Sequence, residues 1–253
     1  MNIDIMPPPH TAVEDAAPQP DLWRAASQPA PPHHLGHRDR LRERAGAGGL
    51  AALPDYEVLE LILFRSIRRG DMKPLAKQLL ARFGSLGAVL GATAEDLRTV
   101  KGVGPEVALD LKLLHEAGLR TAREQVKRRP VISSWTALLA YVKTALAHEP
   151  REQFRVLFLD KKNQLIADET MNHGTVDHAP VYPREVVRRA LELSASNLIL
   201  VHNHPSGDPT PSPADVDMTR QIVDAARPLR ITIHDHLVAG RDGVASFKAL
   251  GLM

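Results

Sequence analysis

Two histidines and an aspartate near the C-terminus have the residue types and spacing of a metal site. His202 and His204 follow the apolar run 197–201, which is typical of a buried strand. Residues i and i+2 of a strand share a face, with Cα atoms roughly 6.6 Å apart, so both imidazoles can reach one ion. Asp215, at the start of a predicted helix, is the candidate third ligand. Three such ligands with one open position are typical of catalytic zinc, so the pattern indicates a hydrolase with one Zn²⁺.

The segment around Asp215 also fits an ordinary helix start. Ser212 is a good N-cap, Pro213 suits the first helical position, and an acid at position 215 completes a capping box. The two interpretations are compatible, because the dipole of a helix N-terminus keeps a carboxylate ionised and in place for a metal. The chain has no cysteine, so a zinc site must use histidine and carboxylate. The inner face of this helix is predicted to carry Val216, Thr219, Val223 and Ala226.

The arrangement His202-x-His204, seven residues, Ser212, two residues, Asp215 matches the JAMM (MPN+) metalloprotease signature. The wider stretch 202–215 resembles the bacterial RadC family, and only about the first 34 residues lie outside the resemblance. The resemblance implies a JAMM fold and cleavage of a peptide or isopeptide substrate by zinc-activated water. It also implies a link to DNA repair, at the level of process only. The upstream stretches that resemble the family's N-terminal domain are 36–38, 55–61, 73–76 and 82–85.

The resemblance also assigns two catalytic residues. In JAMM enzymes, the carboxylate that accepts and returns the proton stands at the start of an early strand, and Glu152 is the matching position. Glu152 shares strand parity with Phe154 and Phe158, so it points to their face of the predicted sheet. An ordinary surface glutamate is the alternative. The resemblance makes Ser212 a donor to the developing oxyanion, in competition with its capping role.

Asp235 and His236, in the predicted strand 231–238, have two open interpretations. Either side chain could orient a metal ligand by hydrogen bonding to it. The strand end could equally face water, and the sequence does not decide between these.

The elements around these residues predict a two-domain protein of 253 residues. Residues 1–34 are rich in Pro and Ala and are expected to be disordered. Residues 35–130 have helical periodicity and predict an all-α domain with a helix-hairpin-helix. Residues 131–253 alternate between helix and strand and predict an α/β domain with a mixed sheet flanked by helices. The expected elements are a helix at 134–147, strands at 153–160, 164–171, 197–201, 231–238 and 244–247, and helices after Pro183 and Ser212.

The segment 97–108 resembles a helix-hairpin-helix. Gly102 and Gly104 bracket a tight turn that would expose backbone N–H groups to a phosphate, and Lys101 adds charge. Residues 35–130 hold 18 Lys and Arg against 12 Asp and Glu, a net charge of +6, whereas residues 131–253 hold 13 against 14. This favours non-specific DNA contact through the helical domain, but such turns also pack protein against protein.

No basic stretch followed by a long apolar run opens the chain, and no run reaches the roughly 18 to 20 apolar residues of a membrane helix. We therefore expect a cytoplasmic protein without membrane contact. The leading hypothesis is a zinc metallopeptidase or isopeptidase tethered by its helical domain. The rival is a non-catalytic, DNA-associated interaction protein on a JAMM scaffold.

Overall fold

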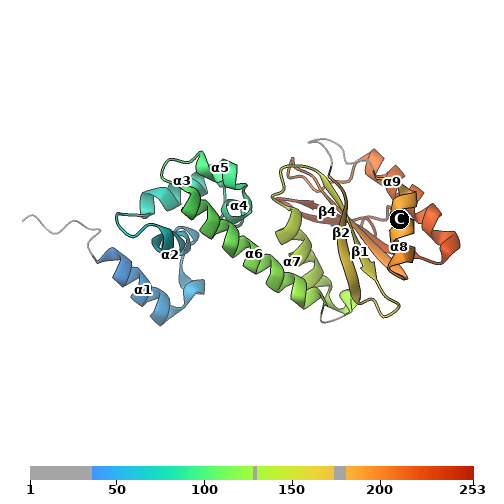
Figure 1. The fold of residues 1–253 in the computed structure, drawn as a ribbon, viewed down its shortest axis with the longest axis horizontal. Helices are drawn as coiled ribbons and strands as arrows, with labels where there is room; N and C mark the ends of the chain where they lie inside the picture. The colour runs from blue at the N-terminus through green and yellow to red at the C-terminus, as the bar shows by residue number, and fades with distance from the viewer. Residues whose placement is uncertain (1–35, 128–129, 174–180) are drawn as a thin grey trace, which may run out of the picture.

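The structure is a computed structural model that describes residues 36–127, 130–173 and 181–253. A group of helices, α1–α6, precedes a mixed five-stranded sheet with its own helices (Figure 1). The predicted fold class is therefore confirmed. The expectation of disorder for residues 1–34 lies outside the described residues. Among the described helices, none is both long and apolar enough to cross a membrane.

The helical part is built on leucines at helical spacing. Leu59 and Leu63 of α2 pack with Leu79 of α3 and Leu97 of α5 in one core. Ser85 and Thr93 cap α4 and α5 by accepting backbone N–H groups, as expected for hydroxyl side chains. The helices are α1 (His37–Gly48), α2 (Asp55–Ser66), α3 (Lys73–Phe83), α4 (Leu86–Gly91), α5 (Ala94–Arg98) and α6 (Pro105–Lys127), with a 3₁₀ turn at Leu50–Ala52.

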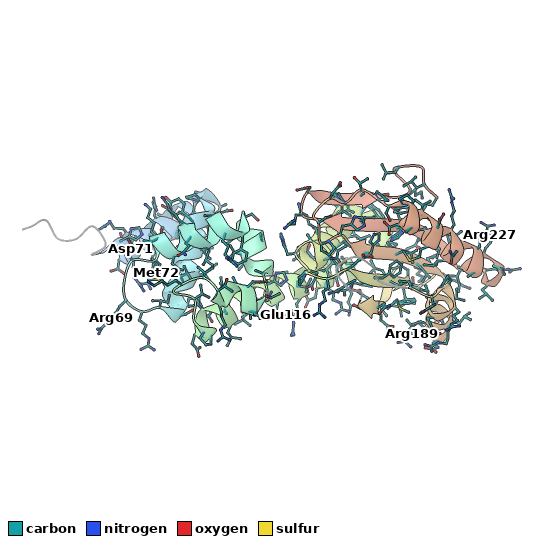
Figure 2. All side chains as sticks on the ribbon, turned by 90° about the horizontal axis from the view of Figure 1, so that it is seen from above. Arg69, Asp71, Met72, Glu116, Arg189 and Arg227 are labelled. Carbon is teal, nitrogen blue, oxygen red and sulfur yellow. The ribbon has the colours of Figure 1, made fainter. Side chains whose placement is uncertain are left out.

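Helix α6 connects the two parts of the molecule. Near its start, Val107 and Leu111 belong to the core of the helical part. Near its end, Val126 belongs to the core beneath the sheet. Figure 2 shows Glu116, between these contacts, at the narrow waist of the molecule, with Met72 in the helical part and Arg227 at the opposite end.

The sheet has the strand order β2-β1-β3-β4-β5, in which β3 and β4 are parallel and the other neighbours are antiparallel. The expected strands all form, although β3 continues through His202 to Asn203, so that His204 is the first residue after the strand. The strands are β1 (Gln153–Leu159), β2 (Leu165–His173), β3 (Asn197–Asn203), β4 (Thr232–Gly240) and β5 (Gly243–Ser246).

Helices cover both faces of the sheet. Leu198 and Leu200 of β3 face the core shared with α8 (Pro183–Glu192) and α9 (Pro213–Ala226). Ile199 and Val201 face the core shared with α7 (Trp135–Leu146) and the end of α6. This alternation continues at the end of β3, so His202 and Asn203 point to opposite faces.

The prediction for the inner face of α9 was wrong at two positions. The buried residues are Asp215, Thr219, Ile222 and Ala226, a spacing of four, three and four. Val216 and Val223 are only partly buried. The capping turn aims Asp215 inward, so Asp215 and Ile222 take the places predicted for Val216 and Val223, while Thr219 and Ala226 are buried as predicted.

Candidate metal centre

The end of β3 and the start of α9 bring His202, His204 and Asp215 together. Nε2 of His202 lies 3.0 Å from Nε2 of His204. The carboxylate of Asp215 places Oδ1 at 3.3 Å from Nε2 of His202 and Oδ2 at 3.4 Å from Nε2 of His204. His202 and Asp215 are buried, and His204 is partly exposed, so the cluster is open to solvent on the His204 side.

The capping box that the sequence predicts is present and orients Asp215. The Ser212 hydroxyl accepts the backbone N–H of Asp215 at 3.2 Å, and the Ser212 N–H donates to Oδ2 of Asp215 at 2.7 Å. The Ser212 hydroxyl also donates to Oδ2, at 2.7 Å. The hydroxyl hydrogen is thus directed at the carboxylate in this structure, so helix capping and carboxylate positioning are one device.

A hydrogen-bonded chain fixes the tautomer of His202. The Thr219 hydroxyl donates to the carbonyl oxygen of Asp215 at 2.6 Å, so it accepts from Nδ1 of His236, also at 2.6 Å. Complete burial lowers the pKa of His236 well below its ordinary value, so His236 is neutral. Nε2 of His236 must then accept from Nδ1 of His202, at 2.8 Å. The lone pair of His202 is left on Nε2, facing His204 and Asp215.

The tautomer of His204 is also fixed, but by a backbone carbonyl. Its Nδ1 donates to the backbone carbonyl of Asp208 at 2.9 Å, so the neutral ring has its lone pair on Nε2. The loop that supplies this carbonyl is packed tightly on β4. A Cβ at Gly240 would lie 2.1 Å from the carbonyl oxygen of Gly207, and Gly207 itself has a φ of +101°.

The electrostatics of the cluster favour a bound cation. Burial tends to raise the pKa of Asp215, but its contacts with the two histidines and the bond from Ser212 hold it far below its ordinary value, so the carboxylate is ionised. With both rings in the neutral tautomers that His236 and the Asp208 carbonyl favour, the cluster presents this carboxylate and two ring nitrogens with inward lone pairs. Atoms bound tetrahedrally at about 2.0–2.1 Å lie about 3.3–3.4 Å from one another, close to the separations seen here. The three residues fit a zinc-sized ion.

Two family models match the chain. A RadC-like JAB domain matches residues 132–252, and a UPF0758 N-terminal domain matches residues 33–109. The chain joins a UPF0758 N-terminal domain to a RadC-like JAB domain. The predicted RadC resemblance is thereby confirmed, and the His202, His204 and Asp215 cluster resembles a JAMM metal site.

Glu152 lies beside the cluster of the JAB domain. Phe154 of β1 pairs with His202 of β3, and the same antiparallel register, continued by two residues, brings Glu152 opposite His204. The charges agree with this placement. The bond with Asp215 does most to raise the pKa of His204, burial opposes the rise, and the negative charge of Glu152 adds to it.

The structure decides between the two interpretations of Asp235 and His236 geometrically. His236 is fully buried and contacts His202, as the ligand-orienting interpretation expected. Asp235 is also buried but bonds elsewhere, accepting from the backbone N–H of Lys248 at 3.0 Å and from the Ser246 hydroxyl. Asp235 therefore ties β4 to the C-terminal turn. Sequence reasoning missed Thr219 and Asn203 as site residues. Asn203 was missed because strand parity places its side chain on the face of the sheet away from the histidines.

The turn between α5 and α6, where the sequence predicts a helix-hairpin-helix, has one position whose backbone favours glycine. Gly102 has a φ of +100°, which favours glycine, and a Cβ at Gly104 would meet nothing within 4 Å. Lys101 and Gly102 are exposed, while Val103 is buried in the helical core. The predicted contact positions Lys101, Gly102 and Gly104 lie in the helical part, apart from the metal cluster.

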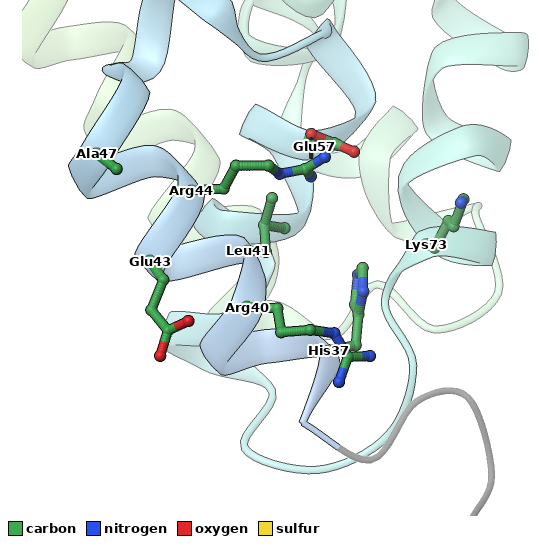
Figure 3. A pocket seen from close by; sticks show the side chains of 8 residues that line it. All are labelled: His37, Arg40, Leu41, Glu43, Arg44, Ala47, Glu57 and Lys73. Carbon is green, nitrogen blue, oxygen red and sulfur yellow. Dashed lines mark hydrogen bonds and ion pairs between the residues drawn. The ribbon is translucent and has the colours of Figure 1, made fainter. Parts of the chain in front are cut away.

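A hollow of about 590 Å³ lies between α1 and the start of α2 and α3 (Figure 3). Cationic side chains line it, but the acids of α2 balance several of them. Arg44 donates to Glu57 at 2.5 Å, and His37 lies 2.7 Å from the buried Glu60. These pairs attach α1 to α2, so the charged residues at the hollow serve to hold the two helices together.

Proposed function

We propose that this chain is a JAMM-type zinc metallohydrolase that cleaves an amide bond in a peptide or isopeptide. The observation that carries the proposal is the mutual spacing of Nε2 of His202, Nε2 of His204 and the Asp215 carboxylate. Three such donors leave a fourth position for water or substrate, which is the catalytic type of zinc site. The RadC-like JAB match supports the same reaction class.

When bound, zinc supplies a Lewis acid that brings the pKa of water toward about 7 and polarises a carbonyl. Glu152 takes a proton from the attacking water as the water oxygen adds to the carbonyl carbon. As the carbon–nitrogen bond breaks, Glu152 returns this proton to the leaving nitrogen, so one water yields one acid and one amine. Stabilisation of the oxyanion by Ser212 stays a prediction, because the hydroxyl would have to turn from Asp215.

Metal content tests the ligand set. Purified protein should hold about one zinc ion per chain, and His204→Ala and Asp215→Ala should both lose it. His234→Ala is the matched control, because His234 is a histidine near the start of β4 whose ring contacts Asn163 at 2.7 Å, outside the cluster. Absence of zinc from wild type supplied with the metal, or its retention in both ligand variants, would leave only the rival role of a non-catalytic scaffold.

Cleavage is tested by comparing cells that carry wild type with cells that carry Glu152→Gln. New protein termini, identified by mass spectrometry, should appear with wild type and vanish with the variant. Glu152→Gln should keep its zinc, because Glu152 is outside the three-residue cluster. Identical termini in the two strains would contradict a hydrolytic role even if zinc is bound.

We also propose that the turn at Lys101, Gly102 and Gly104 contacts the backbone of DNA without reading its sequence. Its exposed lysine and its glycine turn at the start of α6 support this. Lys101→Glu should weaken binding to a random duplex and flatten its salt dependence. Glu106→Gln, in the first turn of α6, controls for general perturbation. Equal salt slopes for wild type and Lys101→Glu would remove this contact.

A further inference from the structure

Asn203, between the two clustered histidines in sequence, contacts a different segment from theirs. It is 1% exposed and lies on the α7 side of the sheet. Its Oδ1 accepts the backbone N–H of Gln153 at 2.9 Å. Its Nδ2 donates to the carbonyl oxygens of Arg151 at 3.1 Å and Glu149 at 3.3 Å. The amide thus makes three hydrogen bonds, all to residues 149–153, which lead from the end of α7 into the first residue of β1.

Two of these bonds bracket Glu152. The carbonyl of Arg151 belongs to the peptide unit before the Cα of Glu152, and the N–H of Gln153 belongs to the unit after it. Each peptide unit is planar, so the orientation of the two units sets φ and ψ of the residue between them. One buried side chain therefore holds both backbone dihedrals of Glu152.

We propose that Asn203 is a positioning residue that fixes Glu152 against the metal cluster. The inference rests on the proposed function, in which Glu152 carries the proton. His202 and Asn203 are adjacent on β3 and point to opposite faces, so β3 positions both the ligand and the proton carrier. The single strand β3 then sets the distance between His202 and Glu152, independently of the rest of the segment between α7 and β1.

The competing explanation is that Asn203 only satisfies buried backbone groups. Asn197, at the other end of β3, does that: its Nδ2 donates to the Asp160 carbonyl and to Asn163, both at 3.0 Å. Asn197 has the same strand parity and a comparable set of bonds, but its partners lie in the turn between β1 and β2. Asn197→Leu is therefore the matched control for Asn203→Leu.

Amide hydrogen exchange in the full chain tests the contact. Asn203→Leu should raise the exchange rate of the Gln153 N–H about fivefold or more, because that N–H loses its acceptor. Asn203→Asp, a smaller change if the leucine variant folds poorly, keeps the acceptor for Gln153 and should preserve its protection. Asn197→Leu should leave Gln153 exchange unchanged. Unaltered Gln153 exchange in a folded Asn203→Leu protein would overturn the proposal.

A double-mutant cycle tests the link to catalysis, using the turnover of a peptide identified from the new termini described above. In the zinc-loaded protein, Asn203→Leu and Asn203→Asp should each lower kcat about 10- to 100-fold with little change in KM, as for a misplaced proton carrier. In the Glu152→Gln background, the same changes should add almost nothing. Additive effects in this cycle would show that Asn203 does not act through Glu152.

Zinc content separates this inference from the proposed function. Asn203→Leu should keep wild-type zinc, because its bonds do not reach the cluster side of the sheet. Loss of zinc from Asn203→Leu would mean that Asn203 organises the ligands, and the proposal would fall. A wild type that holds no zinc or cuts no peptide would contradict the proposed function and the catalytic role, while Gln153 exchange would still decide whether Asn203 holds the segment.

Discussion

Asp168 on β2 and Asp215 on α9 are both buried carboxylates of the RadC-like JAB domain, and their partners differ. Asp168 accepts two hydrogen bonds from Arg155, at 3.0 and 2.9 Å, and another from the Tyr141 hydroxyl. Its positive partner is thus part of the chain. Asp215 instead faces the ring nitrogens of His202 and His204, whose lone pairs point inward in the neutral state.

The comparison shows why one buried acid is structural and the other is suited to bind a ligand. An arginine is always charged and matches a carboxylate with two parallel bonds, so the Asp168 site is complete without an outside ion. The gap beside it holds only about 10 Å³, too little for a bound group of any size. Neutral imidazoles bring no charge, so the Asp215 site is balanced only when a proton or a metal ion enters.

The largest expected effects come from removing each carboxylate in turn, since one loss should affect zinc binding and the other the stability of the fold. Asp215→Ala should abolish zinc binding and, in chelator, lower the free energy of unfolding by only about 1 kcal/mol, because Ser212 loses its acceptor but still caps the helix. Asp168→Ala should keep zinc but lower the free energy of unfolding by about 3–5 kcal/mol, because Arg155 is left unpaired. Urea denaturation and metal analysis measure both. A folded Asp168→Ala protein without zinc would contradict the division between the two sites.

Acidification should weaken zinc binding through His204 and not through Asp215. The pKa of Asp215 is held far below its ordinary value, so this carboxylate stays ionised while His204 takes up a proton. The pKa of His204 is raised, chiefly by its bond to Asp215, so proton competition begins above its ordinary value of 6.5 and affinity rises with pH through that region. Each ring nitrogen for which a proton competes with the metal contributes about a tenfold fall in zinc affinity per pH unit. A limiting slope of three in a chelator competition would show that Asp215 also takes up a proton.

The His236 and Thr219 chain should tune zinc affinity without creating it. Thr219→Val keeps the shape of the side chain but removes the acceptor for Nδ1 of His236, which loosens the tautomer of His202. We expect zinc to bind about 10- to 100-fold more weakly, the usual loss for such supporting residues. Thr144→Val is the control, since its hydroxyl also bonds one turn back in a helix, to Ala140, but touches no histidine. Equal zinc affinity in Thr219→Val and wild type would remove this chain from the site.

Much of the site could be predicted from local rules, and the remainder depends on tertiary contacts. Strand alternation predicts that His202 and His204 share a side, and capping chemistry predicts that Ser212 orients Asp215. No local rule predicts that Asn203 meets the segment at 149–153, fifty residues earlier, because that contact depends on how β1 pairs with β3. His236 was assignable only as one of two alternatives, since its partner lies on a parallel strand brought in by a crossover.

The same distinction holds for the fold. The strands and the long helices follow hydrophobic periodicity, which acts within a few residues. The inward face of α9 was misjudged because a buried carboxylate at its first turn takes a place that the pattern assigned to Val216. Functional burial of a polar side chain thus overrides apolar spacing where the metal cluster is built.

The smallest expected effect concerns the Asp168 site and tests whether its arginine alone suffices. Tyr141→Phe removes one hydroxyl donor from Asp168 but leaves both bonds from Arg155. Because the carboxylate keeps its charge partner, the free energy of unfolding should fall by only about 1–1.5 kcal/mol, and the zinc content should not change. Val142→Ala, in the same core, calibrates a change in packing that leaves the ion pair alone. A loss in Tyr141→Phe as large as in Asp168→Ala would mean that the hydroxyl, rather than the guanidinium, keeps the buried charge tolerable.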